Sequence, residues 1–185
     1  MVKVGVLALQ GDFREHVRAL SRIGATPSEV RTPQDLTDVD RLVIPGGEST
    51  TIAKLARAVD LVDPIVERAR EGMPVFGTCA GMIVLAERVL DGEPLFPLMD
   101  VTVRRNAYGR QVDSFEADLD VEAIDHPVRG VFIRAPWIED VGDGVEVLAE
   151  LEDRPVVLRQ GRLLAASFHP ELVGETGLHE FFLSL

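Results

Sequence analysis

The sequence has a single cysteine, Cys79, and only two lysines, Lys3 and Lys54, in 185 residues. One cysteine excludes an internal disulfide and leaves a lone thiol that needs an explanation. The chain carries 31 acidic and 19 basic residues, a formal net charge of -12 at pH 7. This excess of negative charge argues against nucleic-acid binding, which relies on a basic surface to displace counterions.

Long apolar runs, internal repeats and low-complexity tracts are also missing. No run approaches the roughly 18 apolar residues that predict a membrane span. The N-terminus lacks the pattern of a signal peptide, and residues 4–9 are typical of a buried strand. We therefore expect a cytoplasmic protein with no membrane association. The length suits one domain and no linker is visible, so a single domain over residues 1–185 is predicted.

Buried strands alternate with helical spacing in the first half of the chain. Strands are expected at residues 4–9, 28–31, 41–44 and 74–77, and helices at residues 12–23, after Gly47, from Asp63-Pro64 and at residues 82–90. Ser49 or Thr50 is a candidate cap for the helix after Gly47. This alternation predicts an α/β fold with a parallel sheet covered on both faces.

The second half of the chain has a different pattern. Its expected elements are strands joined by turns, followed by a short C-terminal helix. The strands are predicted at residues 100–104, 114–119, 130–135, 145–150, 156–160 and 163–168. They indicate an antiparallel extension of the mostly parallel sheet.

Cys79 lies where a predicted strand meets a predicted helix, in Gly77-Thr78-Cys79-Ala80-Gly81. Such an elbow lifts a nucleophile above the sheet, and its glycines let the strand and helix pack closely. The helix N-terminus favours a thiolate, and backbone N–H groups near Ala80 can stabilise an oxyanion. A lone cysteine is more often a small buried apolar residue. The two glycines and the strand-turn-helix context favour a nucleophile here.

A thiolate catalyst needs a base, and His169 has the most suitable context. It ends the apolar run at residues 163–168, and the carboxyl ends of parallel strands gather functional groups. Residues two apart in an extended segment face the same way, so Glu171 is predicted to orient the imidazole. Taken alone, the segment fits a strand-end histidine beside a solvated glutamate equally well, but Cys79 favours a triad. The histidines without a catalytic context are His16, expected on the surface or in packing, His126 and His179.

Pro45-Gly46-Gly47-Glu48-Ser49 follows a predicted strand and opens a helix. Glycines there allow backbone N–H groups to face a ligand. A phosphate loop is the alternative, but its lysine is missing and Glu48 would repel phosphate. The segment is predicted to donate to an oxyanion or to hold an amino acid.

The Cys79 elbow and Ser167-Phe168-His169-Pro170-Glu171 resemble motifs of the class I, or triad, glutamine amidotransferases. Four further blocks narrow the resemblance to the family of glutaminase subunits of pyridoxal 5'-phosphate synthase. These blocks are residues 5–11, 45–51, 105–116 and 131–136. Because the motifs span residues 5–171, their joint occurrence is far more specific than any one block.

The resemblance implies a flavodoxin-like α/β fold and hydrolysis of L-glutamine to L-glutamate and ammonia, with no metal or cofactor. It makes Cys79 the nucleophile, His169 the general acid/base and Glu171 its orienter. The residues that it implies for glutamine binding are Gly47, Glu48, Ser49, Arg105, Ile133 and Arg134. Arg104 is the neighbouring alternative to Arg105, which is preferred because it directly precedes Asn106.

The resemblance also implies a hetero-oligomer with a synthase subunit, which uses the ammonia to make pyridoxal 5'-phosphate. Gln10 would link that partner to the oxyanion hole. Three alternatives are a glutaminase for histidine or nucleotide synthesis, a protease-like cysteine hydrolase and a non-catalytic binding subunit. The block at residues 105–116 argues against the first two, and the intact triad argues against the third.

Overall fold

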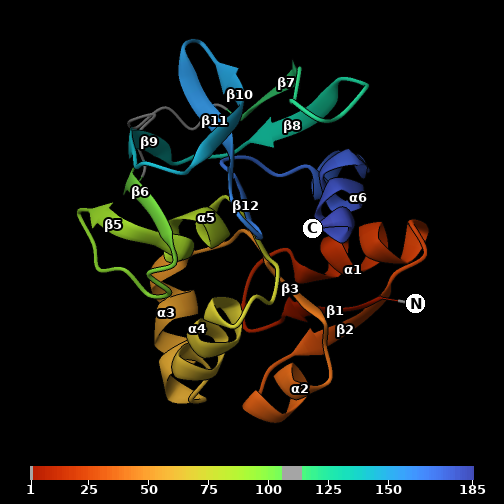
Figure 1. The fold of residues 1–185 in the computed structure, drawn as a ribbon, viewed down its shortest axis with the longest axis vertical. Coiled ribbons are helices and arrows are strands. Elements are labelled where there is room, and N and C mark those ends of the chain that lie inside the picture. Colours follow the sequence, from red (N-terminus) through yellow and green to blue (C-terminus); the bar gives the residue numbers. More distant parts are fainter. Residues whose placement is uncertain (1, 106–113) are drawn as a thin grey trace.

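A computed structural model describes residues 2–105 and 114–185. Seven strands form its main sheet in the order β10-β11-β12-β4-β3-β1-β2 (Figure 1). Their bounds are β1 (Lys3–Leu7), β2 (Thr26–Val30), β3 (Arg41–Ile44), β4 (Val75–Thr78), β10 (Glu146–Leu151), β11 (Arg154–Gln160) and β12 (Leu163–Ala166). Neighbouring strands from β12 to β2 are parallel, whereas β10, β11 and β12 pair antiparallel. The predicted parallel sheet with an antiparallel extension is confirmed.

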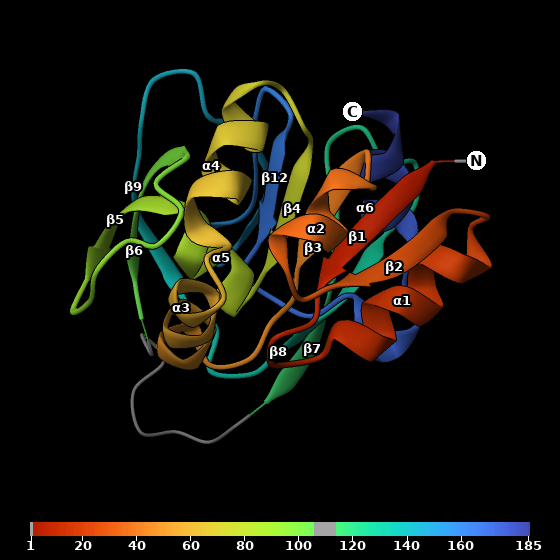
Figure 2. The ribbon, with the colours of Figure 1, turned by 90° about the horizontal axis from the view of Figure 1, so that it is seen from below.

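Helices cover both faces of this sheet (Figures 1 and 2). One face packs against α1 (Phe13–Arg22) and α6 (Gly177–Ser184), and the other against α2 (Pro33–Thr37), α3 (Ser49–Ala58), α4 (Val62–Arg70) and α5 (Ala80–Leu85). The alternation of side chains along a strand separates the two cores. In β3, for example, Val43 packs with Leu20 of α1, whereas Leu42 and Ile44 pack with Ile52 of α3.

Two smaller sheets lie beside the main one. β5 (Ala86–Leu90), β6 (Met99–Arg104) and β9 (Trp137–Val141) form a three-stranded sheet, and β7 (Phe115–Leu119) pairs with β8 (Val128–Phe132). The predicted helix at residues 82–90 is wrong beyond Leu85, because residues 86–90 pair with β6 as a strand. Neither β9 nor α2 was predicted.

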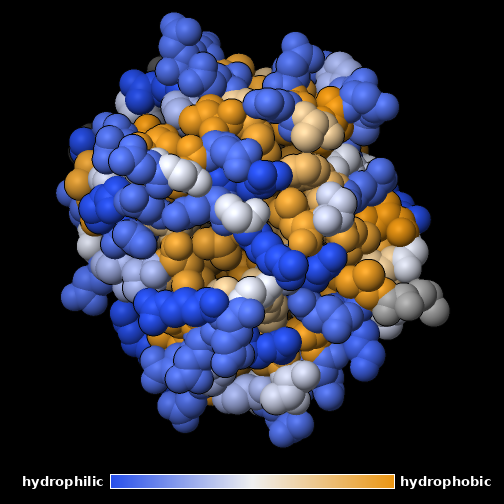
Figure 3. Space-filling view, in the orientation of Figure 1, coloured by the Kyte–Doolittle hydropathy of each residue, from blue (hydrophilic) through white to orange (hydrophobic). Residues whose placement is uncertain are grey.

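Polar side chains cover much of the surface. On the face shown in Figure 3, hydrophilic residues dominate the rim and hydrophobic residues show between them. Among the described residues, the large apolar side chains with most exposure are Phe115, Ile133, Leu172 and Val173. No helix within the described ranges is long and apolar enough to cross a membrane.

Candidate active site

Cys79 forms a sharp turn between β4 and α5. Its φ of 49° lies in the left-handed region, a strained conformation that costs a non-glycine residue on the order of 1–3 kcal/mol. The Cys79 N–H donates to the Ala166 carbonyl at 2.8 Å, which ties the turn to β12. A Cβ on Gly81 would lie 2.1 Å from the Ile44 carbonyl oxygen, and one on Gly77 would lie 2.6 Å from the Gly81 backbone. The two glycines are therefore required for the elbow predicted from the sequence.

His169 is held beside this elbow by backbone and side-chain contacts. Its N–H donates to the Val131 carbonyl at 2.9 Å in an isolated bridge. Its Nδ1 lies 2.8 Å from Oε1 of Glu171, as the sequence predicted. The predicted reason is wrong, because Pro170 is helical and Glu171 begins the 3-10 turn η1 (Glu171–Val173). The strand also ends at Ala166, so a compact turn and not an extended segment brings the pair together.

The pair is buried and charged. Burial opposes a charge on His169, but hydrogen bonds and charges of Cys79 and Glu171 outweigh it and raise the pKa of His169 to about 10. Burial likewise opposes the Glu171 carboxylate, whereas His16 and His169 hold the pKa of Glu171 below its usual range. The imidazole is therefore protonated at neutral pH, with Nδ1 directed at Glu171. This orientation leaves Nε2 for Cys79.

A cleft of about 510 Å³ opens over Cys79 and His169. This volume suits a small ligand. The predicted glutamine-binding residues all line it: Gly47, Glu48, Ser49, Arg105, Ile133 and Arg134. The Ile133 carbonyl lies 3.9 Å from Sγ of Cys79, and Arg134 has a positive φ of 46°. The sequence blocks around residues 45–51 and 131–136 therefore meet at one cavity. Residues 106–113 of the block at 105–116 lie outside the described residues.

The Glu48 side chain caps α3. Its carboxylate accepts from the N–H of Thr50 at 3.1 Å and of Thr51 at 2.7 Å. Hydrogen bonds from both hydroxyls and both N–H groups lower the pKa of Glu48 to about 2, against a small effect of burial. Glu48 is thus the N-cap, and the prediction of Ser49 or Thr50 is wrong. The carboxylate favours the helix N-terminus because it accepts otherwise unpaired N–H groups there.

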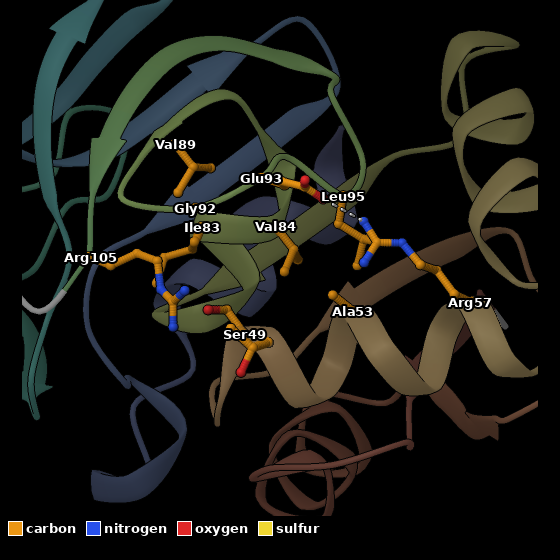
Figure 4. Close-up of a pocket in the computed structure, with 11 residues that line it drawn as sticks. Ser49, Ala53, Arg57, Ile83, Val84, Val89, Gly92, Glu93, Leu95 and Arg105 are labelled. Atoms are coloured by element: carbon orange, nitrogen blue, oxygen red, sulfur yellow. Dashed lines mark ion pairs between the residues drawn. The ribbon is translucent and has the colours of Figure 1, made fainter.

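Arg105 extends from the end of β6 toward this cap, with Nη2 3.3 Å from Oε1 of Glu48. Arg105 and Ser49 line the cleft and also a smaller pocket of about 210 Å³, and Figure 4 shows both side chains at that smaller pocket. The neighbouring Arg104 instead pairs with Glu139 and is more exposed. The geometry therefore favours Arg105 over Arg104 as the arginine of the cleft.

Gln10 reaches the glycine segment from the loop after β1. Its Oε1 accepts from the Glu48 N–H at 2.8 Å, next to Gly47, whose φ is 145°. The Asp12 N–H donates to the Gly46 carbonyl at 3.3 Å. The loop therefore rests on the backbone that was predicted to bind an oxyanion or an amino acid.

Two residues of the site were not predicted. Asp12 lies with Oδ2 3.6 Å from Nδ1 of His169, and burial raises the pKa of this carboxyl. His16 is fully buried, with Nε2 3.4 Å from Oε1 of Glu171, so of its two expected positions, surface or packing, the structure shows the packing one. A signal was present: His16 lies three residues after Phe13 and four before Leu20, which places it on the apolar face of α1.

Asp12, His169 and Glu171 also form a cluster whose ligand atoms lie within 4.8 Å of one another. Within the described part of the chain, this is the one group of three such side chains with the spacing of metal ligands. A metal ion needs a deprotonated imidazole, whereas His169 holds its proton against Glu171. The cluster is therefore better suited to proton transfer than to metal binding.

A mostly parallel sheet with a cysteine elbow and an adjacent His–Glu pair defines a class I glutamine amidotransferase. Residues 6–185 match the SNO glutamine amidotransferase family, and the chain belongs to this family. The pyridoxal 5'-phosphate synthase subunit PdxT of Parafrankia sp. (strain EAN1pec) is 59% identical over 187 residues, with 99% of this chain and 92% of the relative covered. PdxT of Mycobacteroides abscessus is 56% identical, with 98% of this chain and 96% of the relative covered.

Solved structures agree with the fold. A crystal structure of a glutamine amidotransferase superposes with a TM-score of 0.93 at 52% identity, and the match covers 98% of this chain and 97% of the other. PurLQS from Thermotoga maritima superposes with a TM-score of 0.77 at 19% identity, and the match covers 99% of this chain and 98% of the other. At that identity the second likeness supports the fold alone.

Proposed function

We propose that this chain is the glutaminase subunit of a pyridoxal 5'-phosphate synthase. It hydrolyses L-glutamine to L-glutamate and ammonia, and it supplies the ammonia to a synthase subunit. The observation that carries the proposal is the position of Cys79 beside the buried His169–Glu171 pair at the cleft. Membership of the SNO family and the likeness to PdxT proteins support the same function.

In the first half-reaction, the Cys79 thiolate attacks the side-chain amide carbon of glutamine. The carbonyl electrons move to oxygen, and backbone N–H groups near Ala80 and Gly47 stabilise this oxyanion. His169 then donates a proton from Nε2 to the amide nitrogen as the C–N bond breaks. Ammonia leaves, and a γ-glutamyl thioester on Cys79 remains.

Water completes the cycle. The now neutral His169 takes a proton from water, and the resulting hydroxide attacks the thioester carbon. The C–S bond breaks, which restores the thiolate and releases glutamate. Glu171 keeps the His169 ring oriented and stabilises its positive charge in both half-reactions.

Substrate binding follows from the chemistry of the lining. Glutamine has an α-carboxylate, which the planar guanidinium of Arg105 or Arg134 can bind through two hydrogen bonds. Glu48 holds Arg105 in place, and Gly47, Ser49 and the Ile133 backbone complete the seat. The Glu48 carboxylate itself is occupied by the start of α3.

The synthase partner follows from the fate of the product. Ammonia is protonated in bulk water and then cannot act as a nucleophile, so transfer requires a docked partner and a sheltered path. Gln10 occupies the Glu48 N–H, and a partner that moved Gln10 would change the donors available to the oxyanion. We further propose that the complex is cytoplasmic and that residues 1–185 form one domain.

The test measures ammonia release from glutamine with and without the synthase subunit. We expect low activity from the chain alone, a marked rise in the complex and loss of activity in Cys79→Ala. Cys79→Ser serves as a control, because it keeps the size of the side chain and replaces the thiol by a much weaker nucleophile. Equal rates with and without the synthase would contradict ammonia coupling.

A covalent label separates the enzyme from a binding-only subunit. An electrophilic glutamine analogue should add one mass increment to the wild-type chain and none to Cys79→Ala. Excess glutamine should protect the wild type. A chain that binds glutamine but forms no adduct would exclude Cys79 as the nucleophile.

A further inference from the structure

A second histidine lies behind the proposed catalytic pair. His16 is fully buried, and its Nε2 lies 3.1 Å from Oγ1 of Thr78 and 3.4 Å from Oε1 of Glu171. On the other side of the ring, Nδ1 lies 2.9 Å from Nε2 of His179, which is also fully buried. His16 thus joins β4, η1 and α6 through polar contacts inside the core.

Polar contacts of this kind need a reason, because the surroundings are apolar. Phe76 packs edge-on against both histidine rings, and Phe182 packs against Phe76. Apolar side chains of similar volume would fill such a site without the cost of desolvating two imidazoles. A purely structural role therefore does not account for the His16–His179 pair.

The reason is that the buried Glu171 carboxylate needs a second hydrogen-bond donor besides His169. Its Oε1 is shared by His169 at 2.8 Å and His16 at 3.4 Å, and its buried Oε2 has no hydrogen-bond partner among the described residues. A buried carboxylate with one donor is poorly stabilised, because each missing hydrogen bond leaves part of the desolvation cost uncompensated. A proton on His16 Nε2 supplies a second donor to the same oxygen.

We propose that His16 is a positioning residue of the triad, which keeps the Glu171 carboxylate charged and directed at His169. His179 fixes the ring of His16 through Nδ1, so that Nε2 carries the proton toward Glu171. The proposal rests on the proposed glutaminase function, because the orientation of His169 matters only if His169 transfers protons. The titratable groups around His16 are Glu171 on η1, His179 on α6 and Asp12 at the start of α1.

A matched pair of variants separates the two contacts of His16. In His16→Gln the amide nitrogen reaches the position of Nε2 and keeps a donor to Glu171. In His16→Asn the shorter amide reaches the position of Nδ1, so the contact to His179 is kept and that to Glu171 is lost. Both variants place one amide in the same core, which makes their folding costs comparable.

The variants are assayed in the complex with the synthase, by kcat and KM for glutamine. We expect His16→Asn to lower kcat about 10- to 100-fold with little change in KM, the range for loss of a hydrogen bond to a buried charge. His16→Gln should retain most of kcat. Phe182→Leu, which disturbs the same core without touching the polar contacts, should lower the melting temperature and leave kcat near the wild-type value.

Equal values of kcat in His16→Gln and His16→Asn would overturn the proposal, as would a loss of kcat that tracks the melting temperature across all three variants. If the His16 variants do not fold, nitrogen NMR of the wild-type chain decides, because the proposal requires a proton on His16 Nε2 at neutral pH. An unprotonated Nε2 would refute it. Failure of the glutaminase itself is recognised separately, as a wild-type complex without Cys79-dependent ammonia release.

Discussion

Gly46 offers a direct test of how closely the cleft is built around His169. A Cβ added at Gly46 would lie 2.2 Å from Cε1 of the imidazole, whereas ordinary van der Waals contact begins at 3.4 Å. The ring must therefore retreat by the difference, 3.4 − 2.2 = 1.2 Å. The Val131 bridge fixes the His169 backbone and the bond to Glu171 fixes the ring through Nδ1, so the retreat strains these contacts and breaks the alignment with Cys79.

A misplacement of about 1 Å at a catalytic group can cost on the order of 100-fold in rate. We therefore expect Gly46→Ala to lower kcat about 100-fold in the synthase complex, with a smaller change in KM. Global unfolding is not expected, because the φ of Gly46 lies outside the left-handed region that alanine avoids.

The assay is steady-state ammonia release, with thermal unfolding followed in parallel. Gly177→Ala is the matched control, because the atoms nearest to its added Cβ are the movable ends of Glu175 and His126 at 3.0 Å, and Gly177 does not line the cleft. Wild-type kcat in a folded Gly46→Ala protein would refute the inference that Gly46 packs too closely against His169 to admit a Cβ.

Three further predictions concern charged residues of the site. Glu171→Gln should lower the pKa of His169 from about 10 toward 6.5. When the rate of Cys79 alkylation is plotted against pH, the alkaline limb of the curve should therefore move to lower pH. Because the folded-state pKa of His169 is raised, its contribution to stability is complete below pH 6.5 and is lost as pH rises through about 10; urea unfolding of the wild type should show that loss and the variant should not. Glu48→Gln should destabilise α3 by about 1 kcal/mol at neutral pH, and because the pKa of Glu48 is depressed, this difference should shrink as pH falls from 4.5 toward 2; equal stabilities at pH 7 would contradict the capping role. Arg105→Lys should raise KM for glutamine roughly tenfold through loss of the planar fork, whereas Arg104→Lys should leave KM unchanged, and the reverse order would exchange the roles of the two arginines.

The strand–helix alternation was predictable because the spacing of apolar residues along each segment indicates strand or helix locally. Residues 86–90 show where local preference fails. Ala86, Glu87 and Leu90 favour helix, yet the segment pairs with β6 and becomes β5. Parallel pairing with β6, the next strand along the chain, outweighed intrinsic propensity there, and the pattern of residues 86–90 alone does not indicate such a partner.

The candidate site likewise has a part that local motifs predict and a part that depends on contacts between remote residues. The elbow at Cys79 and the His169–Glu171 pair follow from short motifs, and the structure brings them together as predicted. The role of His16 could not be predicted, because its partners Thr78 and His179 lie 62 and 163 residues away in the chain. The single domain, the cytoplasmic location and the synthase partner stay predictions.

The lone thiol at the elbow also means that one chemical reaction, at Cys79, both reports and abolishes the proposed activity. Because Cys79 is the one cysteine in the sequence, titration of thiols measures the fraction of intact clefts with no background from other sites. A sulfenic acid formed on Cys79 has no neighbouring thiol in the chain with which to form a protective disulfide. An external thiol must therefore condense with the sulfenic acid, with loss of water, and a second external thiol then reduces the mixed disulfide, which ties ammonia supply to the redox state of the surroundings.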